Sequence, residues 1–223
     1  MPKLYGTYRS RATRNIWLAA EADIDLDIIQ VWQGYRLADP TAEDAPLNTR
    51  APSFRHFNPA GTIPVLDDGG LILTESLAIN LYLARTYGGE LGPQTSVEDA
   101  QMQQWALFAA TSLEEPGLQL QTLHTEGRAG TAKGKTEASA LRGKLALPLM
   151  ALEAHLTRQR FMVGHRFSVA DVNTAEVLRY ATSDPQVLAD KPATRDWLAA
   201  CQDRPAFQHM WALRNAEPIN YPG

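Results

Sequence analysis

The sequence predicts an α/β domain followed by an all-helical domain (α/β + all-α). Short apolar strands alternate with helices only in the first third of the chain, and beyond it only helical spacing remains. A polar, glycine-rich stretch, GGELGPQTS, separates the two patterns and is typical of a linker. We therefore expect an α/β domain at residues 1–87, a linker at 88–96 and a helical domain at 97–223.

The first elements of the α/β domain form a β-α-β pattern. Residues 3–8 and 27–32 are short apolar runs with strand character, and residues 12–22 between them place Ile16 and Ala20 on one face of a helix. A helix between two strands allows the strands to pair in parallel. The connection that follows the second strand is rich in proline, and its single short helix cannot be placed from the sequence.

A hairpin and a helix complete this domain. Residues 64–66 and 71–73 are apolar runs on either side of the turn sequence Asp-Asp-Gly-Gly. Leu77, Leu81 and Ala84 then repeat at helical spacing until a pair of glycines ends the helix. The predicted order of the domain is therefore β-α-β, a connection, then β-β-α.

Leucine spacing predicts long helices in the second domain, with a polar break at residues 124–136. The leucines that share one face are Leu141, Leu145, Leu149, Leu152 and Leu156. Pro148 lies among them and is expected to kink this helix, because proline removes a backbone donor. Ser168 and Asp171 have the spacing of a capping box, which marks a helix start with a structural role.

Composition and charge exclude several classes of function. The 223 residues are 44% apolar and carry a net charge of −4, without the basic excess of a protein that binds nucleic acid or an anionic membrane. No apolar run has the length of a signal peptide or a membrane span, so we expect a cytoplasmic protein. Cys201 is the single cysteine and the five histidines are scattered, so we expect no intramolecular disulfide and no metal site.

Three segments, in the correct order, resemble the cytosolic glutathione transferases (glutathione S-transferases, GSTs). The stretch NPAGTIPVL…ILTESLAINLYLA at residues 58–84 resembles the glutathione-site signature of the family, and GHRFSVADV at 164–172 resembles its helical-domain capping box. SRATR at residues 10–14 resembles the serine-type (theta- or delta-like) members of bacterial style. The resemblance covers nearly the whole chain and implies a thioredoxin-like first domain with a mixed four-stranded sheet.

The resemblance implies glutathione as co-substrate and indicates where it binds. The family counterpart of Pro64 is cis, an isomer that roughly 5% of X-Pro bonds adopt, and this turns the backbone of Ile63 toward an extended peptide that pairs as an added strand. Ser76 would hold the γ-glutamyl carboxylate at a helix start, and Glu75 would attract the ammonium group. From the residues alone, Pro64 could simply begin an edge strand, and the Glu-Ser pair could simply be favourable first-turn residues.

Two further positions bear on glutathione binding. Arg11 is a weaker candidate contact within a positive strand-helix junction. Gly61 stands where relatives often have a basic or amide side chain that reaches the glycine end of glutathione. Such a contact would come from Arg55 or His56, or would be absent.

The resemblance assigns thiol activation to Ser10, which precedes Arg14 by four residues. A thiol becomes a good nucleophile as the thiolate, so a hydroxyl that donates a hydrogen bond to it lowers the thiol pKa. Tyr8 is the runner-up, because other classes use a tyrosine near the end of the first strand. From the sequence alone, Ser10 also suits a plain helix N-cap. Cysteine-type members are disfavoured, because Cys201 lies in the helical domain.

The second substrate is expected to be a small apolar electrophile. Tyr8, Trp105 and Phe108 are candidates for its site, although such aromatic residues are more often part of a core. Glutathione conjugation is the leading function. Glutathione-dependent isomerisation, dehalogenation or peroxide reduction, and a non-catalytic dimeric binding module, remain alternatives. The resemblance also implies a homodimer.

Overall fold

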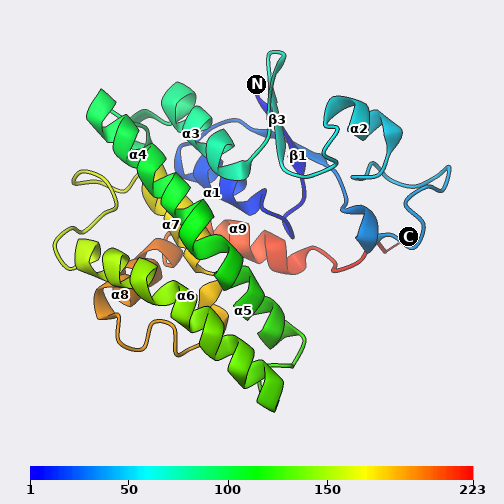
Figure 1. Cartoon of the computed structure of the whole chain (residues 1–223). Helices are drawn as coiled ribbons and strands as arrows, with labels where there is room; N and C mark the ends of the chain where they lie inside the picture. Colours follow the sequence, from blue (N-terminus) through cyan, green and yellow to red (C-terminus); the bar gives the residue numbers. More distant parts are fainter. Residues whose placement is uncertain (223) are drawn as a thin grey trace. The chain divides into compact units, whose positions relative to one another are not determined.

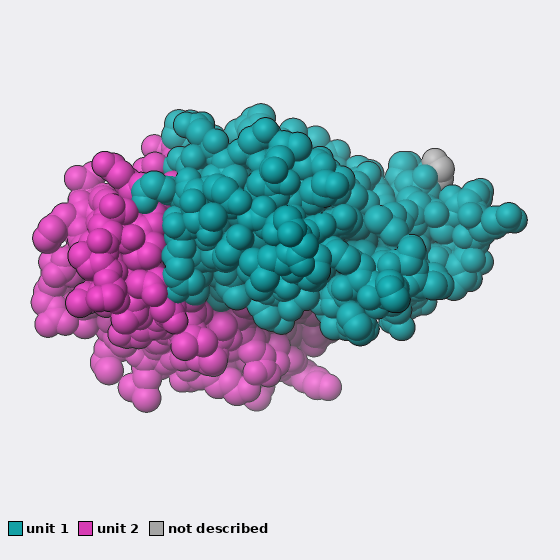
Figure 2. Space-filling view, turned by 90° about the horizontal axis from the view of Figure 1, so that it is seen from above, with its two compact units in different colours: residues 1–89, 205–223 teal, residues 90–204 magenta. Residues whose placement is uncertain are grey.

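The computed structural model describes residues 1–222 and divides the chain into two compact units. The first unit comprises Met1–Gly89 together with Pro205–Gly223, and the second comprises Glu90–Arg204 (Figure 2). The expected helical domain ran from residue 97 to the end of the chain. In the structure, the segment from Pro205 onward groups with the α/β part instead.

The first unit is built on a mixed four-stranded sheet with the order β2-β1-β3-β4 (Figure 1). The strands are β1 (Lys3–Gly6), β2 (Asp27–Gln30), β3 (Val65–Asp68) and β4 (Leu71–Leu73). β1 pairs in parallel with β2 and antiparallel with β3, and β3 forms the predicted hairpin with β4. The predicted fold class is confirmed. β1 ends at Gly6, two residues earlier than expected, because the chain turns there into the loop 7–12.

Four helices accompany this sheet. They are α1 (Thr13–Glu21), α2 (Pro52–Phe57), α3 (Ser76–Tyr87) and α9 (Pro205–Ala216), with short helical turns η1 (Gly34–Arg36) and η2 (Gly89–Leu91). α1 packs against both α3 and α9. Trp17 is fully buried, and its ring meets Phe207 of α9 edge-on at 4.9 Å between centroids. This contact is why the end of the chain belongs to the first unit.

The proline-rich connection holds the short helix that the sequence could not place. It is α2, and Pro52 occupies one of its first positions, where a fixed φ and a missing N–H cost the helix nothing. Phe54 of α2 joins Val31 and Val65 in a buried cluster, and Ile63 packs against that cluster. The strand that begins after Pro64 is thereby seated on its own core.

The second unit is helical. Its elements are α4 (Ser96–Phe108), η3 (Ala109–Glu114), α5 (Glu115–Thr125), α6 (Ala132–Leu156), α7 (Val169–Leu178), η4 (Ala181–Ser183) and α8 (Pro192–Gln202). α6 continues through Pro148 as one helix of 25 residues and buries the whole predicted leucine face. Among the described residues, no helix is long and apolar enough to cross a membrane.

The expected capping box begins α7. The Ser168 N–H donates to Asp171 Oδ2 at 3.0 Å. The other carboxylate oxygen, Oδ1, accepts the Met162 N–H at 3.0 Å and Trp197 Nε1–H at 2.9 Å. Burial raises the pKa of Asp171 to about 6, while these hydrogen bonds oppose that shift. Asp171 of the capping box therefore also links α7 to α8 and to the loop that precedes α7.

Candidate active site

Ser10 lies in the loop between β1 and α1 and is half-buried. Its hydroxyl donates to the Thr7 carbonyl at 2.7 Å and accepts the Ala12 N–H at 3.0 Å. The Ser10 carbonyl accepts from the Thr13 hydroxyl at 3.1 Å. The side chain thus shapes the turn that starts α1. To serve another acceptor, its O–H must rotate away from Thr7.

Gly6 allows this loop to approach the start of β3. A Cβ on Gly6 would lie 2.7 Å from Ala12 Cβ and 3.9 Å from both Ser10 Oγ and Pro64 Cβ. The Ile63–Pro64 peptide bond is cis, as the resemblance implied. The structure therefore brings Ser10 and Pro64 to the same end of β1. Sequence reasoning did not single out Gly6, because a strand glycine carries no mark of what approaches it.

Glu75 and Ser76 meet at the start of α3, but in different environments. Glu75 is exposed and has a left-handed backbone with φ 66°, whereas Ser76 is 3% exposed. Arg14 Nη1–H donates to Ser76 Oγ at 2.9 Å, and Asn15 Nδ2–H donates to the Ser76 carbonyl at 2.8 Å. Asn80 closes the network by donating to the Arg14 carbonyl at 3.1 Å. α1, which follows the Ser10 loop, is therefore hydrogen-bonded directly to the start of α3.

The backbone explains why residue 61 is glycine. Gly61 has φ 61°, and a Cβ there would lie 2.8 Å from the Thr49 carbonyl oxygen. Arg55 Nε–H donates to that same oxygen at 3.3 Å, so the exposed Arg55 side chain lies beside Gly61. His56 is also exposed. Of the two residues expected to compensate for Gly61, Arg55 is thus in contact range of it.

Tyr8 and Arg11 flank Ser10 along the chain. Tyr8 is half-buried, and its pKa is raised first by burial and then by the nearby Glu217 carboxylate, so the phenol stays protonated at neutral pH. It can therefore donate a hydrogen bond, as the runner-up hypothesis requires. Arg11 is exposed at the start of the turn into α1.

Glu217 is a neighbour of this loop that sequence reasoning missed. Its carboxylate accepts the backbone N–H of Tyr8 at 2.7 Å and that of Arg9 at 3.2 Å, and pairs with Arg36 at 2.8 Å. Residues 8 and 217 lie at opposite ends of the chain. A single acidic residue after the last helix belongs to no motif, so the sequence carried no signal for this contact.

Trp105 and Phe108 lie on α4 in the second unit. Trp105 is 9% exposed and meets Phe108 edge-on at 5.3 Å between centroids. The Trp105 ring also lies 4.8 Å from the His155 ring, measured between centroids. Trp105 is thus mostly a core residue, and Phe108 is the more accessible of the two.

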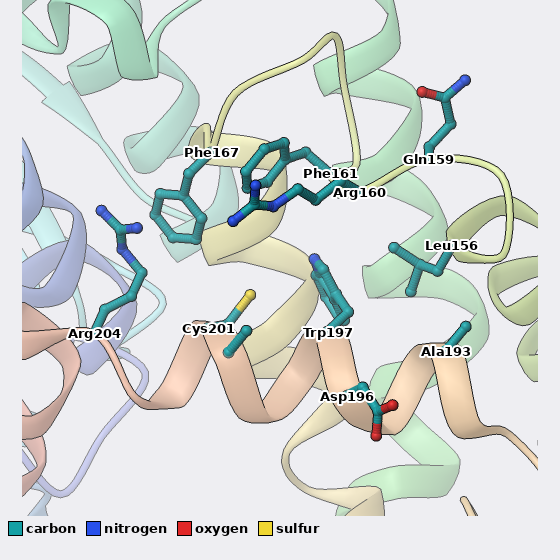
Figure 3. Close-up of a pocket in the computed structure, with 11 residues that line it drawn as sticks. Leu156, Gln159, Arg160, Phe161, Phe167, Ala193, Asp196, Trp197, Cys201 and Arg204 are labelled. Atoms are coloured by element: carbon teal, nitrogen blue, oxygen red, sulfur yellow. The ribbon is translucent and has the colours of Figure 1, made fainter.

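The second unit also contains a hollow of about 410 Å³ between the end of α6, the loop that follows it, and α8 (Figure 3). Trp197 and Cys201 of α8 line it, and Arg204 lies 3.9 Å from the centre of the Phe167 ring. Neither Trp105 nor Phe108 is among its lining residues. This hollow is therefore separate from the predicted second-substrate residues. Within the described part of the chain, no group of three or more His, Cys, Asp or Glu residues could hold a metal ion.

A sheet of this order, with a cis-proline at the start of β3 and helices α1 and α3 packed together, defines a thioredoxin-like domain, and a helical unit follows it. Family models agree with both parts. Residues 4–91 match the glutathione S-transferase N-terminal domain, and residues 102–205 match the C-terminal domain.

Whole-chain comparisons point the same way. Glutathione S-transferase 1 of Zea mays is 33% identical over 218 residues, which cover 95% of this chain and 96% of that protein. A solved glutathione S-transferase-I bound with lactoylglutathione is 28% identical with a TM-score of 0.75, covering 95% of this chain and 99% of that one. A theta-class enzyme of Xanthomonas axonopodis pv. citri, solved with glutathione bound, is 25% identical with a TM-score of 0.72, covering 93% and 95%. The chain belongs to the glutathione S-transferase family and is a glutathione transferase.

Proposed function

We propose that this glutathione transferase binds glutathione on its first unit and activates the thiol through Ser10. The thiol releases its proton to solvent, and the thiolate attacks an electrophilic carbon of an apolar compound to form a thioether. At an aromatic halide the carbon–halogen bond breaks and halide leaves, whereas at an activated alkene the C=C bond opens and the neighbouring carbon takes a proton from water. The observation that carries the proposal is the convergence of Ser10 Oγ and Pro64 at one end of β1. The ligands of the two solved relatives, lactoylglutathione and glutathione, support the choice of co-substrate.

The γ-glutamyl end of glutathione is assigned to the start of α3. Ser76 Oγ accepts a hydrogen bond from Arg14, so its own hydrogen can be donated to a carboxylate. The N–H groups at a helix start and the positive end of the helix dipole favour the same negative group. The exposed carboxylate of Glu75 is placed to attract the ammonium. Serine and glutamate side by side thus suit the two charges of an amino-acid zwitterion.

The rest of the tripeptide would extend toward the cis-proline. Ile63 lies on the other side of the cis bond from Pro64, two residues before β3 begins at Val65, and its backbone N–H and C=O are the groups we assign to the cysteinyl part. Arg11 adds positive charge near the thiol, beside Ser10. Arg55 is the candidate for the glycine end, because it lies beside Gly61.

Ser10 would lower the thiol pKa by donating to the thiolate. A cysteine thiol titrates near 8.5, and a hydrogen bond to a charged group contributes about 1.5–3 kcal/mol, or roughly one to two pKa units. The start of α1 adds about 0.3–1 kcal/mol through its dipole. The Ser10 O–H would leave the Thr7 carbonyl for the thiolate, because a charged acceptor forms the stronger bond. Together these effects make the thiolate the main species at neutral pH.

A panel of electrophiles tests the proposed reaction directly. Wild-type protein should be retained on immobilised glutathione and should form thioethers with aromatic halides or activated alkenes. Tyr8→Phe should conjugate at close to the wild-type rate, because the proposal assigns no proton transfer to the phenol. Activity only toward hydroperoxides would replace conjugation with reduction, and no retention at neutral pH would remove the glutathione site itself.

We further propose that the enzyme acts as a homodimer in the cytoplasm. The two-fold interface is assigned to the neighbourhood of α3 and α4. Val97 and Leu107 of α4 support this, because both apolar side chains are 65% exposed in the single chain. Cys201 is a buried free thiol, which suits a reducing compartment.

A further inference from the structure

The carboxylate of Glu217 anchors the loop that carries Ser10. Oε2 accepts the Tyr8 N–H at 2.7 Å, and Oε1 accepts the Arg9 N–H at 3.2 Å. Oε1 also pairs with Arg36 Nη1 at 2.8 Å, and the side chains of Arg36 and Glu217 are only 4% and 6% exposed. A buried carboxylate with three directed partners has little freedom to move. The two N–H groups it holds immediately precede Ser10.

Arg9 is held from several directions at once. Its guanidinium donates through Nε to the Glu217 carbonyl at 2.6 Å and through Nη2 to the Asn215 carbonyl at 3.3 Å. Its own carbonyl accepts Gln33 Nε2–H at 3.0 Å. The peptide that joins Arg9 to Ser10 is therefore fixed by groups outside the loop. Ser10 itself bonds only within the loop, to Thr7 and Ala12, among the hydrogen bonds described for its side chain.

The tail that supplies Glu217 is itself fastened. Arg36 Nε–H donates to the Ile219 carbonyl at 2.6 Å, and its Nη2–H donates to the Pro218 carbonyl. The Tyr221 N–H returns to the Arg36 carbonyl at 2.9 Å, and the Tyr221 ring meets Trp32 edge-on at 5.3 Å. Figure 1 shows this red segment running from α9 to the blue segment at residues 34–36. Arg36 therefore binds both the backbone of the tail and the Glu217 carboxylate that holds the loop.

We propose that Glu217 is a positioning residue for thiol activation: by holding the Tyr8 and Arg9 N–H groups, it sets where the Ser10 hydroxyl meets the glutathione sulfur. This inference rests on the proposed role of Ser10. A hydrogen bond weakens steeply when its distance or angle departs from the optimum, so a shift of the Arg9–Ser10 peptide raises the thiol pKa without touching the γ-glutamyl site. The chain end thereby completes an active site whose reactive residue lies near the chain start.

The test measures the pKa of bound glutathione thiol, together with kcat, KM and glutathione affinity, in full-length variants. Glu217→Ala removes both acceptors, and we expect the thiol pKa to rise by about one unit and kcat at neutral pH to fall about tenfold. Affinity for glutathione should change less than about threefold, because Ser76 and Glu75 lie on another element. Glu217→Gln keeps one carbonyl-type oxygen as an acceptor. Its thiol pKa and kcat should therefore lie between those of Glu217→Ala and the wild type.

Glu98→Gln is the matched control. Glu98 is also an arginine-paired carboxylate, bound to Arg166 Nη1 at 2.9 Å, but it lies in the second unit. The Glu98→Gln substitution should lower thermal stability and leave the pKa of the bound thiol unchanged. If Glu217→Ala fails to fold, the comparison of Glu217→Gln with wild type decides. A thiol pKa and kcat equal to wild type in folded Glu217 variants would overturn the positioning role alone, whereas a wild-type protein that leaves the thiol pKa unlowered would overturn the Ser10 proposal with it.

Discussion

The Ser10 side chain is held by hydrogen bonds to the backbone of its own loop. Its O–H now satisfies the Thr7 carbonyl, and its oxygen caps the Ala12 N–H. The second bond can persist when glutathione binds, because the oxygen has two lone pairs and only the O–H has to turn. The activation we propose for Ser10 would therefore need the rotation of one hydroxyl and no movement of the backbone.

Glu75 offers a clean test of glutathione binding, because the side chain is exposed and sits outside the buried network. Glu75→Gln keeps the size of the side chain and removes the charge that we propose attracts the ammonium. We expect glutathione affinity to fall about three- to tenfold, or about 1 kcal/mol, with the unfolding free energy unchanged. Isothermal titration and thermal melts measure the two quantities. An unchanged affinity would assign the ammonium to another group.

Ser76 is less suitable for such a test. Ser76→Ala would remove the acceptor that Arg14 uses at 2.9 Å, so folding and binding would change together. Reading both variants side by side separates the two effects, since only one of them should alter the melting temperature.

The second unit contains an ion pair whose effect on stability depends on pH. Arg166 bonds Glu98 and also donates to the Glu90 carbonyl at 2.6 Å, joining η2, α4 and the loop before α7. This arginine, and next the Gln94 N–H, lower the pKa of Glu98 to about 2. The folded state therefore favours the ionised form. The stability it contributes is complete above the ordinary glutamate pKa of 4.5 and is lost as the pH falls toward 2.

Glu98→Gln should reveal that dependence. We expect the variant to be less stable by about 1 kcal/mol at pH 6, a modest value because solvent screens a partly exposed pair. The difference should shrink below pH 4.5 and vanish near pH 2. Denaturant titrations at several pH values measure it. A constant difference across that range would mean that the pair does not set the pKa.

Local pattern predicted most of the elements, and distance along the chain explains what it missed. The hairpin, the capping box at Ser168 and the leucine face of α6 each depend on neighbours a few residues apart, and all three are present. Motifs singled out Ser10 and Pro64; the cis bond at Pro64 is present, and the catalytic role of Ser10 stays a prediction. No motif marked Gly6 or Glu217, because their contacts arise only in the folded chain. Ala12 approaches Gly6 closely, and Glu217 contacts a loop some 200 residues away along the chain.

The unit that α9 joins is also set by contacts between residues far apart in the sequence. Residues after 204 were expected to remain with the helical domain, but Phe207 of α9 packs on Trp17 and the Ile219 carbonyl accepts a hydrogen bond from Arg36. Helical periodicity predicts that α9 exists, and it carries no information on which unit α9 joins. Removing residues 205–222 should therefore disturb the α/β unit.

Assembly is the remaining large-scale expectation. We predict a homodimer that buries the exposed side chains of Val97 and Leu107. Light scattering at micromolar concentration should give twice the chain mass of 24.6 kDa. Leu107→Glu should shift the protein toward monomer, because a charge in an apolar interface is costly to desolvate. A mass of 24.6 kDa for the wild type would contradict the dimer.

Thiol activation by Ser10 can be measured as the pH at which bound glutathione ionises. The ultraviolet absorbance of the thiolate, followed against pH, should place the wild-type midpoint below neutrality or near it, and Ser10→Ala should raise it by roughly one to two units while glutathione still binds. Coincident titration curves for the two proteins would show that Ser10 plays no part in activating the thiol.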